Sequence, residues 1–172
     1  MKTVIFTNSE NLKGMFNVEN YKSSNRTSLS KMIKGNKERL EEIDSELYPF
    51  INAISPQFSF QMDREDLFFV LINENEDIVA ALVLGYNPSG WDSKIEYLMH
   101  SISVEKEYQG KGLSKELINT FFDFCSKNKI SIVKQSPYTK QGKLKIKKTF
   151  NETSKKYPEV SFKDTNKKSF FN

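Results

Sequence analysis

The sequence predicts an α+β domain in which helices flank a mixed, mostly antiparallel sheet. Two β-rich runs, Leu67–Asn73 and Ile78–Tyr86, are separated by four polar residues, which predicts an antiparallel hairpin. Later in the chain a β-prone run, an amphipathic helical pattern and a second β-prone run follow one another, as in a β-α-β unit. Hairpins first and a β-α-β unit later indicate a mixed sheet with helices packed against it.

A single domain over residues 1–172 is expected. The length is ordinary for one domain, and 37% hydrophobic with 13% aromatic residues is enough to fill one core. The longest uninterrupted apolar run, Ile78–Leu84, is far shorter than the roughly 20 residues that cross a bilayer, so no membrane span is expected. The N-terminal residues lack the apolar stretch of a secretory signal. With Cys125 as the only cysteine and His100 as the only histidine, neither an internal disulfide nor a metal site is expected, and a reducing cytoplasm fits best.

The elements before the hairpin are a strand and a helical region. Residues Thr3–Thr7 form a short β-prone run. From Ser28 onward apolar residues recur every three or four positions, with an interruption at Gly35 and Asn36, which predicts two helices or one kinked helix ending near Pro56. These apolar positions are Leu29, Met32, Ile33, Leu40, Ile43, Leu47, Ile51 and Ile54.

The elements after the hairpin alternate between strands and helices. A turn at Asn87–Gly90 leads into the third strand. Apolar residues at helical spacing then predict an amphipathic helix that turns Glu116, Asn119 and Asp123 outward. The predicted elements are a strand over Lys94–Val104, a helix over Leu113–Cys125, a strand over Ile130–Lys134, a Lys-rich helix over Gly142–Lys155 and a closing strand over Val160–Phe162.

The net charge of +4 combines two regions of opposite sign. Residues 1–126 carry 13 Lys and Arg against 19 Asp and Glu, whereas the last 46 residues carry 13 Lys against 3 acids. The basic region predicts an anionic neighbour. A solvated face in a chain rich in lysine throughout explains the same excess equally well.

The segment Gln109–Ser114 lies between a predicted strand and the amphipathic helix. Because Gly110 and Gly112 lack a Cβ, the backbone there can turn sharply and expose successive N–H groups in front of the positive end of the helix dipole. Such a loop can hold phosphate, although a tight strand-to-helix turn explains the two glycines equally well. Lys115 stands where a dinucleotide-binding loop has its third glycine, and no Walker sequence is present.

This segment, Q-G-K-G-L-S, resembles the Q/R-x-x-G-x-G/A pyrophosphate loop of the GNAT superfamily of N-acetyltransferases, with Gln109, Gly112 and Ser114 in the first, fourth and sixth places. Ser114 departs from the usual Gly or Ala. The order of elements over Leu29–Lys155 is similar to that family, and the core motif covers residues 94–128. The resemblance implies a GNAT fold whose sheet is splayed at the motif strand. It also implies transfer of an acetyl group from acetyl-CoA to a primary amine of a small molecule or peptide, by direct attack in a ternary complex.

The resemblance further implies which residues bind the acetyl-CoA co-substrate. Backbone groups of the motif strand would hydrogen-bond the pantetheine arm, and the loop would hold the pyrophosphate through its N–H groups. The strand residues are Ile102, Ser103 and Val104, and the loop residues are Gln109, Gly110, Lys111, Gly112, Leu113 and Ser114. Ser136, after the next strand, is a further candidate polar contact.

A general base is needed because only the neutral amine is a nucleophile. Strand alternation predicts one shared face for Glu96, Leu98, His100, Ile102 and Val104. Glu96 stands thirteen residues before Gln109, the spacing of the general base in the histone-acetylating branch of the family that the chain resembles. A solvated residue at the start of the strand is the alternative for Glu96. For His100 the alternatives are a role through an ordered water and a structural histidine.

The leaving thiolate needs a proton donor, for which the family supplies a tyrosine after the next strand. The usual pattern is missing over residues 130–155, and Tyr138 is the nearest phenol. A plain Ser-Pro-Tyr turn before the last helix is the alternative for both Ser136 and Tyr138. Tyr157 is expected to pack with Pro158 and Phe162, and Cys125 is expected to be a small core residue because an acyl-cysteine would need a base that the sequence does not show.

Two other functional classes stay open. A non-catalytic CoA-binding sensor or interaction module on the same fold is compatible with the missing pattern. Binding of nucleic acid through the C-terminal lysines is not expected, because aromatic residues are not interleaved with them. Those lysines are Lys143, Lys145, Lys147, Lys148, Lys155 and Lys156. The acidic residues of 38–46 suit either a cationic acceptor or a solvated helix, and a homodimer is compatible with the sequence.

Overall fold

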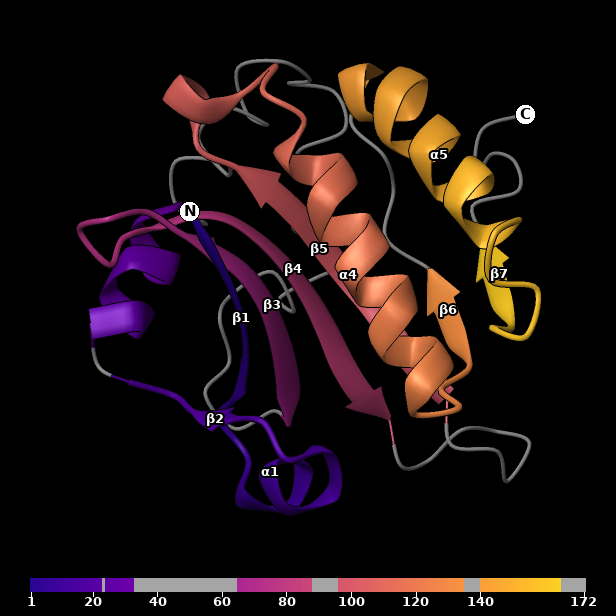
Figure 1. Ribbon diagram of the computed structural model, residues 1–172, viewed down its shortest axis with the longest axis horizontal. Helices are drawn as coiled ribbons and strands as arrows, with labels where there is room; N and C mark the ends of the chain where they lie inside the picture. Colours follow the sequence, from indigo (N-terminus) through magenta and orange to yellow (C-terminus); the bar gives the residue numbers. More distant parts are fainter. Residues whose placement is uncertain (23, 33–64, 88–95, 135–139, 165–172) are drawn as a thin grey trace, which may run out of the picture.

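A computed structural model describes residues 1–22, 24–32, 65–87, 96–134 and 140–164 (Figure 1). In this part of the chain, seven strands form one sheet in the order β2-β1-β3-β4-β5-β6-β7. The strands are β1 (Lys2–Thr7), β2 (Glu19–Asn20), β3 (Asp66–Ile72), β4 (Ile78–Asn87), β5 (Glu96–Val104), β6 (Ile132–Lys134) and β7 (Phe162–Asp164). The helical elements are α1 (Glu10–Phe16), the 3-10 turn η2 (Lys106–Tyr108), α4 (Leu113–Lys127), α5 (Lys140–Ser154) and a helix over residues 24–32.

The sheet is mixed and mostly antiparallel, as predicted. The three longest pairings, β1 with β3, β3 with β4 and β4 with β5, are antiparallel. The short pairings of β1 with β2, β5 with β6 and β6 with β7 are parallel. In the β3–β4 turn the Asn73 side-chain oxygen accepts hydrogen bonds from the N–H groups of Asn75 and Asp77, both at 2.9 Å, so an asparagine stabilises the predicted hairpin.

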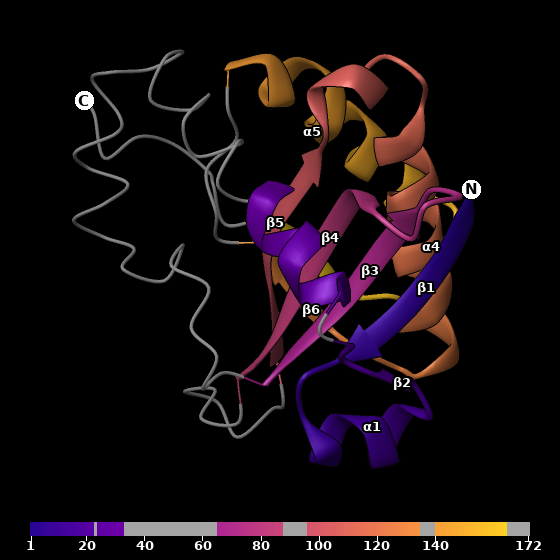
Figure 2. The same cartoon turned by 90° about the vertical axis from the view of Figure 1, so that its left-hand side faces the viewer.

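Alternating side chains divide the core between the two faces of the sheet. On one face α4 packs against β3, β4 and β5, and Leu117, Phe121 and Phe122 are fully buried there (Figure 1). On the other face Leu29 and Met32 of helix 24–32 pack against β1, β3 and β4 (Figure 2). The aromatic content is concentrated on the α4 side, where Phe121, Phe122 and Phe150 stack edge to face or tilted. No helix among the described residues is long and apolar enough to cross a membrane.

The face alternation predicted for β5 is wrong, because a bulge interrupts the strand. Val83 of β4 pairs with Ser101 and the next residue, Leu84, pairs with Met99, so one extra residue of β5 lies between them. Tyr97 and Met99 before the bulge therefore pack on the α4 side together with Ile102 and Val104 after it. Even and odd positions exchange faces at this point, and the five positions from Glu96 to Val104 that were expected on one face do not share one.

Most predicted elements lie within two residues of the observed ones, and α1 and β2 are the main omissions. α1 contains only seven residues and buries only Leu12 completely, which is too little for a helical pattern to be visible. It depends on local capping: the Ser9 side chain accepts a hydrogen bond from the Leu12 N–H group, and Asn17 ends the helix in the left-handed conformation. The predicted helical region beyond residue 32 and the turn at residues 88–90 lie outside the described residues.

Candidate active site

The loop between β5 and α4 contains one turn of 3-10 helix followed by two glycines. The backbone turns at Gly110, with φ 80°, and at Gly112, with φ 82°. An L-residue loses about 1–2 kcal/mol in this left-handed region, so the backbone conformation favours glycine at both positions. A Cβ built on either residue meets no atom within 4 Å. The space beside the loop is therefore open, and the φ angles rather than crowding explain the glycines.

The N–H groups of this loop point to an anion site. Gly112 is the N-cap of α4, and its carbonyl accepts hydrogen bonds from the N–H groups of Lys115 at 3.0 Å and Glu116 at 3.2 Å. Among the described residues, none accepts a hydrogen bond from the N–H groups of residues 110–114. These donors lie at the positive end of the dipole of a 15-residue helix. Free donors at such a place bind phosphate or carboxylate groups.

The edge of β5 next to this loop is splayed from β6. The two strands pair only from Tyr97 with Ile132 to Met99 with Lys134, so within the described residues β6 does not reach the second half of β5. The Glu105 N–H group donates to the Val79 carbonyl at 2.9 Å, which fixes the antiparallel hydrogen-bond pattern with β4. In that pattern the backbone groups of Ser103 face β4, whereas those of Ile102 and Val104 point to the splayed edge.

Two side-chain interactions hold the loop against the strand. The Gln109 Nε2 atom donates to the Val104 carbonyl at 3.0 Å, so this glutamine fixes the end of β5. The Lys111 Nζ atom lies over the Tyr108 ring, 4.8 Å from its centre, in a cation–π contact. The sequence pattern identified Gln109 and Lys111 as loop residues but did not predict either contact.

A comparison with protein-family models identifies this arrangement. The model of the acetyltransferase (GNAT) family matches residues 37–138, which is more than half of the chain and includes β5, the glycine loop and α4. The chain belongs to the GNAT acetyltransferase family. The predicted membership and the predicted α+β fold, with a mixed sheet flanked by helices, are therefore both confirmed.

One solved structure with a TM-score above 0.5 agrees with this fold, and a second has a weaker similarity that carries no argument. A tetramutant of the BH1408 protein from Bacillus halodurans superposes with a TM-score of 0.53 at 12% sequence identity, covering 84% of this chain and 90% of that one. A possible acetyltransferase from Clostridium difficile 630 gives a TM-score of 0.46 at 16% identity, covering 83% of this chain and 90% of that one. At such low identity these similarities concern the fold alone. No curated protein sequence matches the chain.

The predicted catalytic residues of this GNAT chain are described only in part. Glu96 is the first residue of β5 and pairs with Asn87 of β4, while its side chain lies outside the described part, as does that of His100. Ser136 and Tyr138 belong to residues 135–139, which are also outside it. The bulge between Met99 and Ser101 was missed, although the apolar positions of the strand change there from odd to even.

Cys125 lies in the core, as expected, and Tyr157 is partly buried against it. Cys125 is fully buried on the core-facing side of α4, and burial raises the pKa of its thiol far above the usual range. A thiol held protonated in this way is a poor nucleophile, which agrees with the expected role as a small core residue. Tyr157 stacks on Phe122 with ring centres 5.9 Å apart, so it packs against the α4 side of the core.

Proposed function

We propose that this GNAT chain transfers an acetyl group from acetyl-CoA to a primary amine of a small molecule or peptide. The observation that carries the proposal is the row of N–H donors over residues 110–114, directly beyond the splayed edge of β5. A ligand with a diphosphate at one end and amide groups in an extended arm matches such a row of donors followed by a strand edge. Coenzyme A has that chemistry.

The residues present fit this ligand. The diphosphate would accept hydrogen bonds from the loop N–H groups, in the open space beside Gly110 and Gly112. Lys106, Lys111 and Lys115 are exposed beside the loop and could contact a polyanion, although Glu105, Glu107 and Glu116 balance their formal charge, so the proposal depends on the N–H donors. The amide groups of the pantetheine arm would pair with the backbone of Ile102 and Val104 along the splayed edge.

The proposed chemistry is direct attack in a ternary complex. Glu96 would take a proton from the acceptor ammonium, which gives the neutral amine. The amine lone pair then forms a bond to the thioester carbonyl carbon, the carbon–sulfur bond breaks, and the sulfur leaves as thiolate while the nitrogen gives up its second proton to solvent. Tyr138 is the proposed donor of the proton that the thiolate takes up. Holding both reactants in one site supplies a large part of the rate, since effective molarities of oriented groups reach about 10⁵ M or more.

The acceptor is proposed only as a class. A primary amine that is protonated before the reaction would be attracted by acidic side chains, and 19 of the 22 Asp and Glu residues precede residue 127. Polyamines, aminoglycosides, lysine side chains and protein N-termini all satisfy this description. The proposal retains the cytoplasmic location expected from the single cysteine.

Calorimetric titration with acetyl-CoA tests the co-substrate. We expect micromolar binding by the natural sequence and loss of at least tenfold in affinity for Gly110→Glu and Gly112→Glu, which place bulk and negative charge in the loop. Gly14→Glu is the matched control, because Gly14 lies in α1 with no atom within 4 Å of a built Cβ. It should bind like the natural sequence. No binding by the natural protein would refute the proposed co-substrate.

A second experiment separates the enzyme from a non-catalytic CoA-binding module. Release of CoA thiol is followed with a panel of primary amines for the natural protein and for Glu96→Gln. We expect Glu96→Gln to bind acetyl-CoA normally and to transfer about 10²–10⁴-fold more slowly, as for loss of a general base. If the natural protein and Glu96→Gln both bind acetyl-CoA normally and neither transfers the acetyl group to any amine, the result would favour a non-catalytic CoA-binding module.

A further inference from the structure

The exposed side of α5 and the C-terminal end of α4 carry a surface on which lysines outnumber acidic residues. Ile146, Phe150 and Thr153 turn one side of α5 toward the core, and the opposite side is exposed. The surface is defined here by six exposed lysines and is called the basic surface. They are Lys127 and Lys129 at the end of α4, Lys145 and Lys148 in α5, and Lys155 and Lys156 directly after α5.

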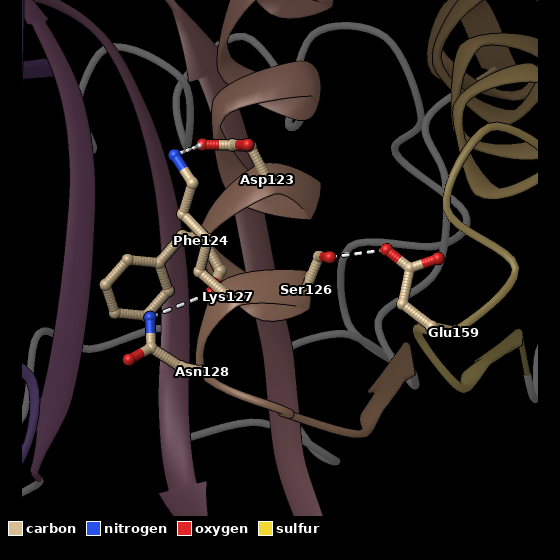
Figure 3. A network of polar contacts seen from close by, with 6 residues as sticks. All are labelled: Asp123, Phe124, Ser126, Lys127, Asn128 and Glu159. Carbon is tan, nitrogen blue, oxygen red and sulfur yellow. Dashed lines mark hydrogen bonds and ion pairs between the residues drawn. The ribbon is translucent and has the colours of Figure 1, made fainter.

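The acidic residues within the basic surface are already engaged. Asp123 accepts an ion pair from Lys127 at 2.7 Å, and Glu152 forms one with Lys148 at 3.7 Å. Glu159 accepts a hydrogen bond from the Ser126 hydroxyl, which also joins the end of α4 to the segment after α5 (Figure 3). The other four lysines, Lys129, Lys145, Lys155 and Lys156, have no carboxylate at ion-pair distance among the described residues.

The basic surface lies apart from the proposed acetyl-CoA loop. Gly110 and Gly112 precede the start of α4, whereas Lys129 follows its end. Lys155 and Lys156 follow the end of α5 that leads to β7, and Figure 1 shows α5 on the outer side of α4. A ligand on this surface would therefore not have to displace acetyl-CoA.

The composition of this surface favours a phosphate backbone over a protein partner. Protein interfaces are depleted in lysine and enriched in aromatic residues and arginine. The basic surface contains lysine alone, and Leu144 is the one large apolar side chain among the described residues of α5 that is mostly exposed, at 76%. Lysine is a point charge that suits phosphates without base-specific geometry.

We propose that the basic surface binds the phosphate backbone of double-stranded nucleic acid, independently of sequence. Single strands are usually bound by aromatic stacking, which this surface does not offer, but a duplex needs only the charges. From Lys145 to its last residue, Ser154, the helix rises about 14 Å, which spans several phosphates of a duplex. This function adds to the proposed acetyl transfer and does not depend on it; it would keep the protein near acceptors that are themselves bound to nucleic acid.

The test is fluorescence anisotropy of a 20-base-pair duplex with the full chain between about 50 and 200 mM salt. Four unpaired lysines predict a slope of log affinity against log salt of about −3.6, from about −0.9 for each phosphate neutralised. The triple variant Lys145→Gln, Lys155→Gln, Lys156→Gln should reduce the magnitude of the slope by about 2.7. The matched control is Lys2→Gln, Lys22→Gln, Lys31→Gln, which removes the same charge from exposed positions elsewhere. It should keep most of the slope.

Each competing explanation has its own outcome. Equal loss in the two triple variants would mean that net charge alone attracts the duplex, and would overturn the proposal. Displacement of the duplex by saturating acetyl-CoA would place it on the glycine loop instead and would overturn it as well. Poly-glutamate that competes as well as duplex at equal charge would indicate an acidic protein partner. The proposal is supported if the duplex stays bound in the presence of acetyl-CoA and of poly-glutamate. Binding should then be lost in the triple variant of Lys145, Lys155 and Lys156 and kept in the control variant.

Discussion

At the start of α4, no described residue accepts from the N–H groups of residues 110–114, whereas near its end the carbonyls of Phe124, Cys125 and Ser126 all accept hydrogen bonds from residues that follow the helix. Asn128 donates to the Phe124 carbonyl through its backbone and through its side chain, the latter at 2.8 Å (Figure 3). The N–H groups of Ile130 and Lys129 donate to the carbonyls of Cys125 and Ser126. One helix thus has an end completed by its own chain and an end that a ligand would complete.

This difference separates residues that act on stability from residues that act on binding. Groups at the closed end satisfy each other in the free protein, so a ligand gains nothing there. Groups at the open end give up hydrogen bonds within the chain and keep their donors for an anion. Changes at the closed end should therefore alter the free energy of unfolding and leave acetyl-CoA affinity unchanged, while changes at the open end should alter affinity.

The largest expected effect lies in the middle of α4, on which both ends depend. Phe121 is fully buried and contacts the rings of Phe69, Phe122 and Phe150. Phe121→Ala should lower the free energy of unfolding by about 3–5 kcal/mol, as for a large aromatic side chain in a core. Urea denaturation measures it. Leu144→Ala, at a position 76% exposed, is the control and should change stability by less than about 0.5 kcal/mol. A similar loss of unfolding free energy in the two variants would contradict the conclusion that Phe121 holds α4 against the core.

The next largest effect is expected at the open end, where one substitution should change both the free energy of unfolding and the affinity for acetyl-CoA. Gly112→Ala should cost about 1–2 kcal/mol in unfolding free energy, because alanine is strained at φ 82°. It should also weaken acetyl-CoA binding by shifting the loop donors. Gly14→Ala, within α1, should instead raise stability by about 0.5–1 kcal/mol and leave binding unchanged. A Gly112→Ala protein with full stability would show that the positive φ does not constrain the loop.

The closed end is tested by Asn128→Ala. Loss of the side-chain bond to the Phe124 carbonyl should cost about 0.5–1.5 kcal/mol, the usual net value of one hydrogen bond. Acetyl-CoA affinity, measured by calorimetry, should not change. Asn151→Ala on the exposed side of α5 should alter neither quantity by more than about 0.5 kcal/mol. Weaker acetyl-CoA binding in Asn128→Ala would remove the distinction between the two ends.

The sequence predicted the elements whose pattern is long and missed those that depend on local contacts. The hairpin and α4 were predictable because many apolar residues repeat at one period over each. α1 depends on Ser9 and Asn17 at its ends, and its seven residues give no period. The bulge in β5 was not predicted because neither glycine nor proline marks it. Its one signal, the change of the apolar positions from odd to even, is obscured by Leu98, which is apolar at an even position.

The candidate site was predictable where backbone conformation restricts the residue type. Gly110 and Gly112 occur at φ angles that disfavour other residues, so the loop is visible in the sequence. The hydrogen bond from Gln109 to the Val104 carbonyl could not be predicted from the sequence, because many polar residues can cap a strand end. The distinction between Ser103 and its neighbours Ile102 and Val104 required the register of β5 against β4, which follows from long-range pairing.

The smallest expected effect is a pH dependence at the closed end. The Ser126 hydroxyl donates to Glu159 and lowers the pKa of that carboxyl below its ordinary value of 4.5. Because the pKa of Glu159 is lower in the folded state, the hydrogen bond from Ser126 stabilises the folded protein fully above pH 4.5, the ordinary pKa of the carboxyl. This stabilisation is lost as the pH falls through the lower pKa of the folded state. The melting temperatures of the natural protein and of Ser126→Ala should therefore differ by a constant amount from pH 7 to 5 and converge toward pH 3. Ser154→Ala, which loses a bond to a backbone carbonyl and no carboxylate, should show a difference that does not vary with pH. A gap between the natural protein and Ser126→Ala that widens in acid would mean that the hydroxyl stabilises the protonated carboxyl instead.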